Sequence, residues 1–239
     1  MSSIDVLCQE SRIRIVEAVV NRHSLRSTVR VTGIPQNRVK ALLMRLGPAC
    51  TRYQHETLRD LIVNPSEYRE AFAFRAKAGN NAAGYQYSHT TGSVWTLACL
   101  DTQTKLVPTW RIGPKSIETV DELRADVAWR YCSAEEASAV SSDCPAPDDI
   151  EQMCRACRTW FLGLEHGFAR KVKRHAAVVA LYLMYYNFSA VHPEIKTTPA
   201  IAAGKASHVW SAEEIVDLLP APAAIRCSAG STSTPTKRT

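Results

Sequence analysis

Residues 24–50, SLRSTVRVTGIPQNRVKALLMRLGPAC, carry the clearest local signals in this sequence. Ser24 is a residue type that caps helix N-termini, and an amphipathic segment follows it. Gly33 permits the backbone angles that close a helix, and Pro35 stands where a new helix can begin. The pattern therefore predicts two helices around a glycine turn, over residues 25–32 and 36–46.

The second of these helices has one apolar and one polar side. Val39 and Leu42 are expected to face inward, at the spacing that packing against the first helix requires. The outward side carries Gln36, Asn37, Arg38, Lys40 and Arg45. Amide and cationic side chains can reach base edges and phosphates, so the layout is typical of a helix-turn-helix. With a further helix expected over 4–21, we predict a DNA-binding domain over 1–60; the alternative is a small three-helix bundle with a basic surface.

The composition fits an ordinary globular protein of 239 residues, with 46% hydrophobic and 22% charged residues and a net charge of +6. The bases are concentrated in residues 1–60, which contain ten Lys or Arg against five Asp or Glu, and in residues 155–174. Such blocks are compatible with a polyanionic partner such as nucleic acid, and solvated helix faces produce similar counts. The start lacks an apolar leader, and the apolar run 176–186 is shorter than the ~20 residues of a membrane span. We therefore expect a cytoplasmic protein with reduced cysteines and no membrane partner.

The rest of the chain mixes strand and helix signals. Two β-runs, 93–100 and 105–112, are joined by a turn at 101–104, and residues 68–74 form a candidate partner strand. Residues 133–147 are small and acidic, which is typical of a loop. Further helices are expected over 116–131, 148–162, 168–190 and 211–219, the last announced by a capping box. The fold class is α+β and helix-rich.

Two clusters of polar residues allow alternative interpretations. Arg170, Lys171, Lys173 and Arg174 lie at the start of the long predicted helix, where cations run against the helix dipole. This misplacement supports phosphate binding, and the alternative is a solvated helix face. Cys154 and Cys157 form a C-x-x-C inside a helical pattern, which favours two thiols on a helix face over a zinc site. No phosphate-binding glycine loop is present, so nucleotide-dependent chemistry is unsupported.

Three blocks, in this order, resemble those of bacterial insertion-sequence transposases of the DDE type. Residues 24–50 look like that family's helix-turn-helix. Residues 92–113, GSVWTLACLDTQTKLVPTWRIG, look like its central hairpin, with corresponding residues at Trp95, Asp101, Thr104 and Lys105. Residues 175–204, HAAVVALYLMYYNFSAVHPEIKTTPAIAAG, resemble its C-terminal signature through Asn187, His192 and Pro199.

The resemblance implies an RNase-H-like domain over residues 66–219, in which a mixed sheet is flanked by helices. In this family three carboxylates hold two divalent metals, Mg²⁺ by preference, for strand cleavage and transfer. The candidates here are Glu70, Asp148 and Glu151, and no residue is assigned as a metal ligand. The implied partner is DNA of the transposon ends, the implied place the nucleoid of a bacterium, and self-association is an open alternative.

The sequence also departs from the family pattern. Arg69 stands where the first catalytic Asp is expected, and an Arg cannot ligate Mg²⁺. The strand expected after the 116–131 helix is absent, as if the domain were truncated between about 131 and 148. We therefore expect a transposase-like protein that binds transposon-end DNA with impaired catalysis; the alternatives are a catalytically dead repressor and a non-functional remnant. Residues 220–239, rich in Ser, Thr, Pro and Ala, are predicted to be a disordered tail.

Overall fold

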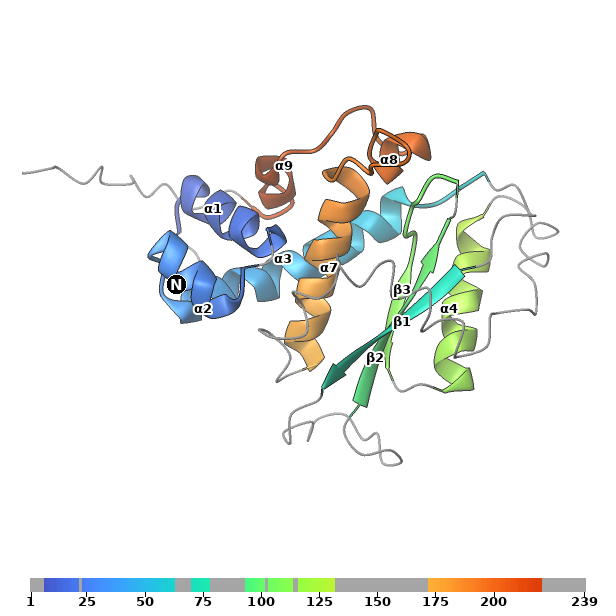
Figure 1. The fold of residues 1–239 in the computed structure, drawn as a ribbon, viewed down its shortest axis with the longest axis horizontal. Helices are drawn as coiled ribbons and strands as arrows, with labels where there is room; N and C mark the ends of the chain where they lie inside the picture. Colours follow the sequence, from blue (N-terminus) through green and yellow to red (C-terminus); the bar gives the residue numbers. More distant parts are fainter. Residues whose placement is uncertain are drawn as a thin grey trace, which may run out of the picture.

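The computed structural model describes residues 7–21, 23–62, 70–77, 93–101, 103–113, 116–131 and 172–220. These form a helix-rich α+β protein with a small sheet, and in Figure 1 the helix Ile117–Arg130 stands to the right of the sheet and the helix Val172–Phe188 to its left. The predicted fold class is confirmed at this level. The elements are α1 (Gln9–Val20), α2 (Leu25–Thr32), α3 (Gln36–Thr57), β1 (Glu70–Lys77), β2 (Ser93–Leu100), β3 (Trp110–Gly113), α4 (Ile117–Arg130), α7 (Val172–Phe188), α8 (Pro199–Ala202) and α9 (Ala212–Val216).

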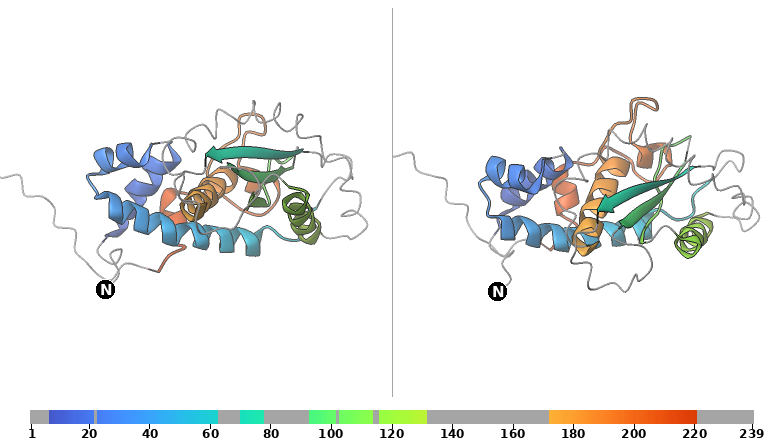
Figure 2. Two further views of the ribbon diagram at one scale, coloured as in Figure 1. Left: turned by 90° about the horizontal axis from the view of Figure 1, so that it is seen from below. Right: turned by 60° about the horizontal axis from the view of Figure 1, so that its bottom comes forward.

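Helix α3 is twice as long as expected. The sequence analysis predicted an end at about residue 46, and the next two residues, Gly47 and Pro48, both disfavour a helix interior. The helix instead continues through both residues to Thr57. Its second half is buried on one side, where Cys50 and Gln54 lie against α7. Burial of this face outweighs the local preference for a break, and Figure 2 shows α3 running along the molecule beneath α7.

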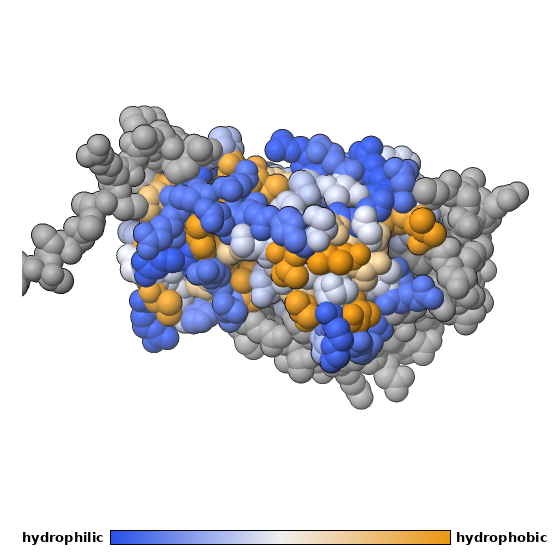
Figure 3. Space-filling model, turned by 90° about the horizontal axis from the view of Figure 1, so that it is seen from above, coloured by the Kyte–Doolittle hydropathy of each residue, from blue (hydrophilic) through white to orange (hydrophobic). Residues whose placement is uncertain are grey.

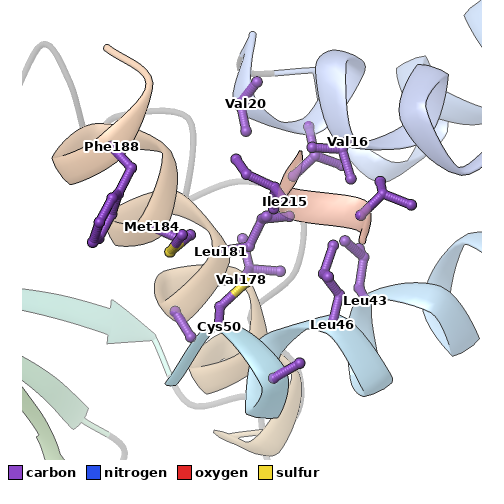
Figure 4. Close-up of a cluster of buried hydrophobic side chains, with 14 of the residues drawn as sticks. Val16, Val20, Leu43, Leu46, Cys50, Val178, Leu181, Met184, Phe188 and Ile215 are labelled. Atoms are coloured by element: carbon purple, nitrogen blue, oxygen red, sulfur yellow. The ribbon is translucent and has the colours of Figure 1, made fainter. Parts of the chain in front are cut away.

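Helix α7 is the centre of the molecule. One of its sides packs into a cluster shared with α1, α3 and α9, in which Ile215 of α9 lies among the other three helices (Figure 4). The labelled members of this cluster are Val16, Val20, Leu43, Leu46, Cys50, Val178, Leu181, Met184, Phe188 and Ile215. The N-terminal helices up to Thr57 and the C-terminal helices therefore share one hydrophobic core. The division into a domain over 1–60 and a domain over 66–219 remains a prediction.

The sheet is an antiparallel meander with the order β1-β2-β3. Glu70 stands opposite Leu100, and Trp95 stands opposite Gly113. β3 is shorter than the predicted strand over 105–112. The reason lies in Asn187, whose side-chain oxygen accepts from the Val107 amide at 3.0 Å and whose amide donates to the Val107 carbonyl at 2.8 Å. This side chain takes the backbone groups that a longer strand would have paired.

A second buried cluster lies between the sheet and the helices α4 and α7. It consists of Leu97, Ala98, Leu100, Val107, Leu123, Val179, Tyr182 and Leu183. Helix α7 therefore packs on two sides, which explains why its sequence is almost continuously apolar. After α4 the chain makes one parallel bridge, from Tyr131 to Leu61. The loop predicted over 133–147 and the helix predicted over 148–162 lie outside the described residues, and so does the region between about 131 and 148 in which the sequence lacks the strand of the resembled family.

The chain after α7 turns back over the helices. Thr198 caps α8, a short helix that the sequence did not predict, with Pro199 at its first position. Ser211 and Glu214 form the predicted capping box of α9, which ends at Val216. Cys50 and Cys99 are free and buried, whereas Cys8 is disulfide-bonded, so the expectation of reduced cysteines is wrong at Cys8. The predicted tail lies outside the described residues except for Pro220. Among the helices that the structure describes, none has the length and apolar character to cross a bilayer.

Candidate nucleic-acid interface

The connection between α2 and α3 is fixed by local hydrogen bonds. The Ser24 hydroxyl accepts from the Ser27 amide at the start of α2, as expected of an N-cap. Gly33 closes α2 with a φ of +71°, and its amide donates to the Val29 carbonyl at 2.9 Å. The Thr32 hydroxyl donates to the Thr28 carbonyl and accepts from the Ile34 amide. The turn is therefore held on both sides, and α3 starts directly after Pro35.

The packing of α3 decides which of its residues face solvent. Val39 and Leu42 are fully buried against the neighbouring helices. Because they hold one side of the helix inward, Gln36 and Asn37 are exposed in its first turn. The predicted cations Arg38, Lys40 and Arg45 are partly exposed. The first turn of α3 thus presents two amides and, beside them, two cations, in the arrangement that the sequence predicted.

The start of α7 places a second group of cations near the middle of α3. Lys173 is exposed and Arg174 is partly exposed, whereas Arg170 and Lys171 lie outside the described residues. A Cβ on Gly47 would meet Ala177, so the two helices cross at this pair. Lys173 is four residues before Ala177, or ~6 Å along α7. The basic start of α7 therefore lies one helical turn from the midpoint of α3.

His175 is not part of this basic surface. It is buried, and its Nε2 lies 2.8 Å from the Thr96 hydroxyl of β2. Burial lowers the pKa of His175 to about 4. The imidazole is therefore neutral at pH 7, and its role is to connect α7 to the sheet.

Of the candidate catalytic carboxylates, only Glu70 lies in the part of the chain that the structure describes. Glu70 is the first residue of β1, and its strand partner Leu100 precedes Asp101. Asp101 is used by the turn, where its carboxylate accepts from the Gln103 amide at 3.0 Å and from the Thr104 hydroxyl. Asp148 and Glu151 lie outside the described residues. Within the described segments, no cluster of three His, Cys, Asp or Glu side chains could hold a metal ion.

The C-terminal signature residues have structural roles. Asn187 is fully buried and, besides its two bonds to Val107, donates to the side-chain oxygen of Gln54 at 3.1 Å. It therefore ties α7 both to α3 and to the segment before β3. His192 closes a turn, since its carbonyl accepts from the Lys196 amide and its amide donates to the Thr197 carbonyl. These contacts explain why a polar Asn ends an apolar helix.

Sequence reasoning missed a charged cluster where α3 ends against α4. Asp126 accepts from the Thr109 hydroxyl and pairs with Arg111 at 3.1 Å and Arg130 at 3.3 Å. Burial alone would raise the pKa of Asp126, but the Thr109 hydroxyl and the two guanidinium groups outweigh it and lower this pKa. Arg130 is buried and also donates to the Leu58 carbonyl at 2.8 Å. The sequence could have indicated the pair of Asp126 and Arg130, which are spaced i,i+4 on α4. No local pattern joins this pair to Thr109 and Arg111 around β3 or to Leu58 at the end of α3.

Next to this cluster stands an exposed indole. Trp129 of α4 is 51% exposed, and its ring is stacked on His55 with centroids 4.9 Å apart. The Arg59 guanidinium lies 4.5 Å from the centre of the same ring. Burial, followed by the charges of Arg130 and Arg59, lowers the pKa of His55 and so favours the neutral form of the stacked imidazole.

On the side of the molecule drawn in Figure 3, hydrophilic residues surround small hydrophobic patches in the described part of the chain. The exposed apolar side chains of the C-terminal segment include Val191 and Val209.

Comparisons of the chain with family models, with curated proteins and with solved structures found no match.

Proposed function

We propose that this protein binds duplex DNA, with the first turn of α3 reading base edges in the major groove. The observation that carries the proposal is the pairing of a rigid turn with exposed recognition side chains. Gly33 and the hydrogen bonds around it fix α3 relative to α2, while Gln36 and Asn37 stay exposed at its start. Asn and Gln side chains can bond adenine through two hydrogen bonds.

The cations beside these amides supply the contacts to the DNA backbone. Arg38 and Lys40 are partly exposed, and neither forms an ion pair with any residue that the structure describes. Each is therefore available to a phosphate, and phosphate contacts position a protein on DNA while base contacts specify the sequence. The basic start of α7 adds Lys173, one turn from α3.

The resemblance to DDE-type transposases makes transposon-end DNA the proposed target and DNA transposition the proposed context. The antiparallel meander followed by α4 is compatible with the start of an RNase-H-like sheet. Catalysis is not part of the proposal, because Arg69 stands where the resemblance places the first catalytic Asp. A DNA-binding relative that occupies transposon ends without cleaving them accounts for these features.

Fluorescence anisotropy with a labelled 24-bp duplex tests the binding, using DNA that flanks the gene and a shuffled duplex of equal composition. Arg38→Ala and Lys40→Ala should each weaken both complexes and make the salt dependence shallower by about one phosphate, a slope change of ~0.9. Lys196→Ala, which removes an exposed cation on a distant loop, is the matched control. Unchanged affinity and salt dependence in the two α3 variants would reject the proposal.

A further inference from the structure

The turn between α2 and α3 exposes two apolar side chains beside the amides of Gln36 and Asn37. Val31, in the last turn of α2, is 55% exposed, and Pro35, the N-cap of α3, is exposed as well. Among the described residues of α1, α2 and α3, Val31 is the only large aliphatic or aromatic side chain with such exposure. In Figure 1 helix α2 lies at the end of the described chain that is far from the strands.

Helix α2 has an unusual pattern of burial. Thr28 and Thr32 face the interior, where apolar residues are the usual choice, while Val31 faces solvent. The position of Thr32 has a structural reason, because its hydroxyl donates to the Thr28 carbonyl and accepts from the Ile34 amide. The packing of the described residues gives no such reason for the exposure of Val31. Single exposed valines are common on protein surfaces, and this one is distinguished by the groups that lie beside it.

Burial alternates along the turn. Val31, Gly33 and Pro35 are exposed, and the residues between them, Thr32 and Ile34, are buried. The solvent side of the turn is therefore formed by an isopropyl group, a glycine and a proline ring, which the two amide side chains of α3 follow directly. The positive φ of Gly33, +71°, and the proline ring restrict this backbone, so the apolar groups keep a constant position relative to the amides.

Apolar groups next to amides match one kind of base pair. In the major groove adenine presents a donor and an acceptor that an Asn or Gln side chain can bond, and its partner thymine presents a 5-methyl group. A guanine–cytosine pair presents no methyl group there. Arg38 and Lys40, which form no ion pair with the described residues, give the surface around the turn a positive charge that attracts phosphates.

We propose that this turn recognises adenine–thymine pairs, with Val31 and Pro35 packing on thymine methyl groups while the amides of Gln36 and Asn37 bond adenine. The proposal rests on the DNA binding proposed above and extends it, because it names the base pairs of the target and assigns base contact to two apolar residues that precede α3. Each thymine methyl group that these side chains cover should tighten binding about four-fold.

Uracil, which differs from thymine only by lacking the 5-methyl group, provides the test. With the full chain and a labelled 24-bp duplex of A·T pairs in mixed order, replacing every thymine by uracil should weaken binding about four-fold or more. A G·C duplex of equal length should bind more weakly than the A·T duplex. The double variant Val31→Ser, Pro35→Ser should bind the thymine and uracil duplexes equally. Both positions are exposed and Ser is a favoured N-cap, so thermal melts should show that this variant stays folded.

Val191→Ser is the matched control, because Val191 is 52% exposed and lies in the loop after α7. This variant should keep the full difference between the thymine and uracil duplexes. If the native chain binds both duplexes equally while Arg38→Ala still weakens binding, methyl recognition is rejected and the proposed function stands. A difference that the double variant keeps also rejects methyl recognition. If the native chain binds no duplex, both proposals are rejected.

Discussion

Gly47 of α3 lies so close to Ala177 of α7 that a Cβ built on Gly47 would stand 2.4 Å from the Ala177 Cα. The two helices that carry the hydrophobic core therefore cross at a residue without a side chain. Any larger residue at this position must push α7 away from α3, and with it the cluster that α1 and α9 share.

Gly47→Ala should accordingly destabilise the protein by about 2 kcal/mol, because the added methyl group overpacks a closed helix crossing. The adjacent substitution Pro48→Ala is a control that should change the stability in the opposite direction. Pro48 is exposed inside the same helix, and Ala restores a backbone donor there, so this change should stabilise the protein. Urea unfolding of both variants measures the two effects. Equal stability of Gly47→Ala and the native chain would show that the helices do not pack as described.

Asn187→Leu should destabilise the protein by about 3 kcal/mol, since it leaves the backbone groups of Val107 and the Gln54 side chain without their partner in a buried site. Tyr186→Phe, which removes a hydrogen bond to the Lys105 carbonyl at a partly exposed position, is the milder comparison at about 1 kcal/mol. Denaturant melts measure both. If Asn187→Leu costs no more than Tyr186→Phe, the side chain does not hold the three elements together.

The lowered pKa of His175 predicts that the protein loses stability at acid pH. Its pKa is about 4 when folded against ~6.5 when unfolded, so below pH 6.5 the unfolded chain takes up a proton that the folded chain refuses. Stability is therefore lost as the pH falls from 6.5 toward 4, by about 2.5 kcal/mol from this group at pH 4.5. Unfolding free energies at pH 7.5 and 4.5 test this. His175→Gln should lose about 2.5 kcal/mol less than the native chain between these two values, and an identical loss would contradict the assignment.

How much the sequence could predict depends on where the deciding contacts lie. The helix α2, its Ser24 cap, the Gly33 turn and the capping box at Ser211 were predictable because their partners are three or four residues away. The length of α3 was not, because its continuation past Pro48 depends on α7, more than a hundred residues later. The short length of β3 was not predictable for a similar reason: Asn187 of α7, about eighty residues later in the sequence, binds the backbone of Val107 just before the strand.

The residues of the candidate site were likewise predictable only where their contacts are local in the sequence. The exposed amides of α3 follow from its own periodicity. The exposure of Trp129 and its contacts with His55 and Arg59 join α3 to α4, and no local pattern announces them. Conversely, His175 reads as part of a basic run but is buried, because it faces the sheet rather than solvent.

The most direct test of the central claim is selection of binding sites from a random duplex library by the full chain. Reading by Gln36 and Asn37 predicts that a defined sequence is enriched, and that Asn37→Ala, which keeps every cation, still binds duplex DNA but enriches that sequence weakly or not at all. Enrichment of no sequence by the native chain, or of the same sequence to the same degree by Asn37→Ala, would contradict base reading by the first turn of α3.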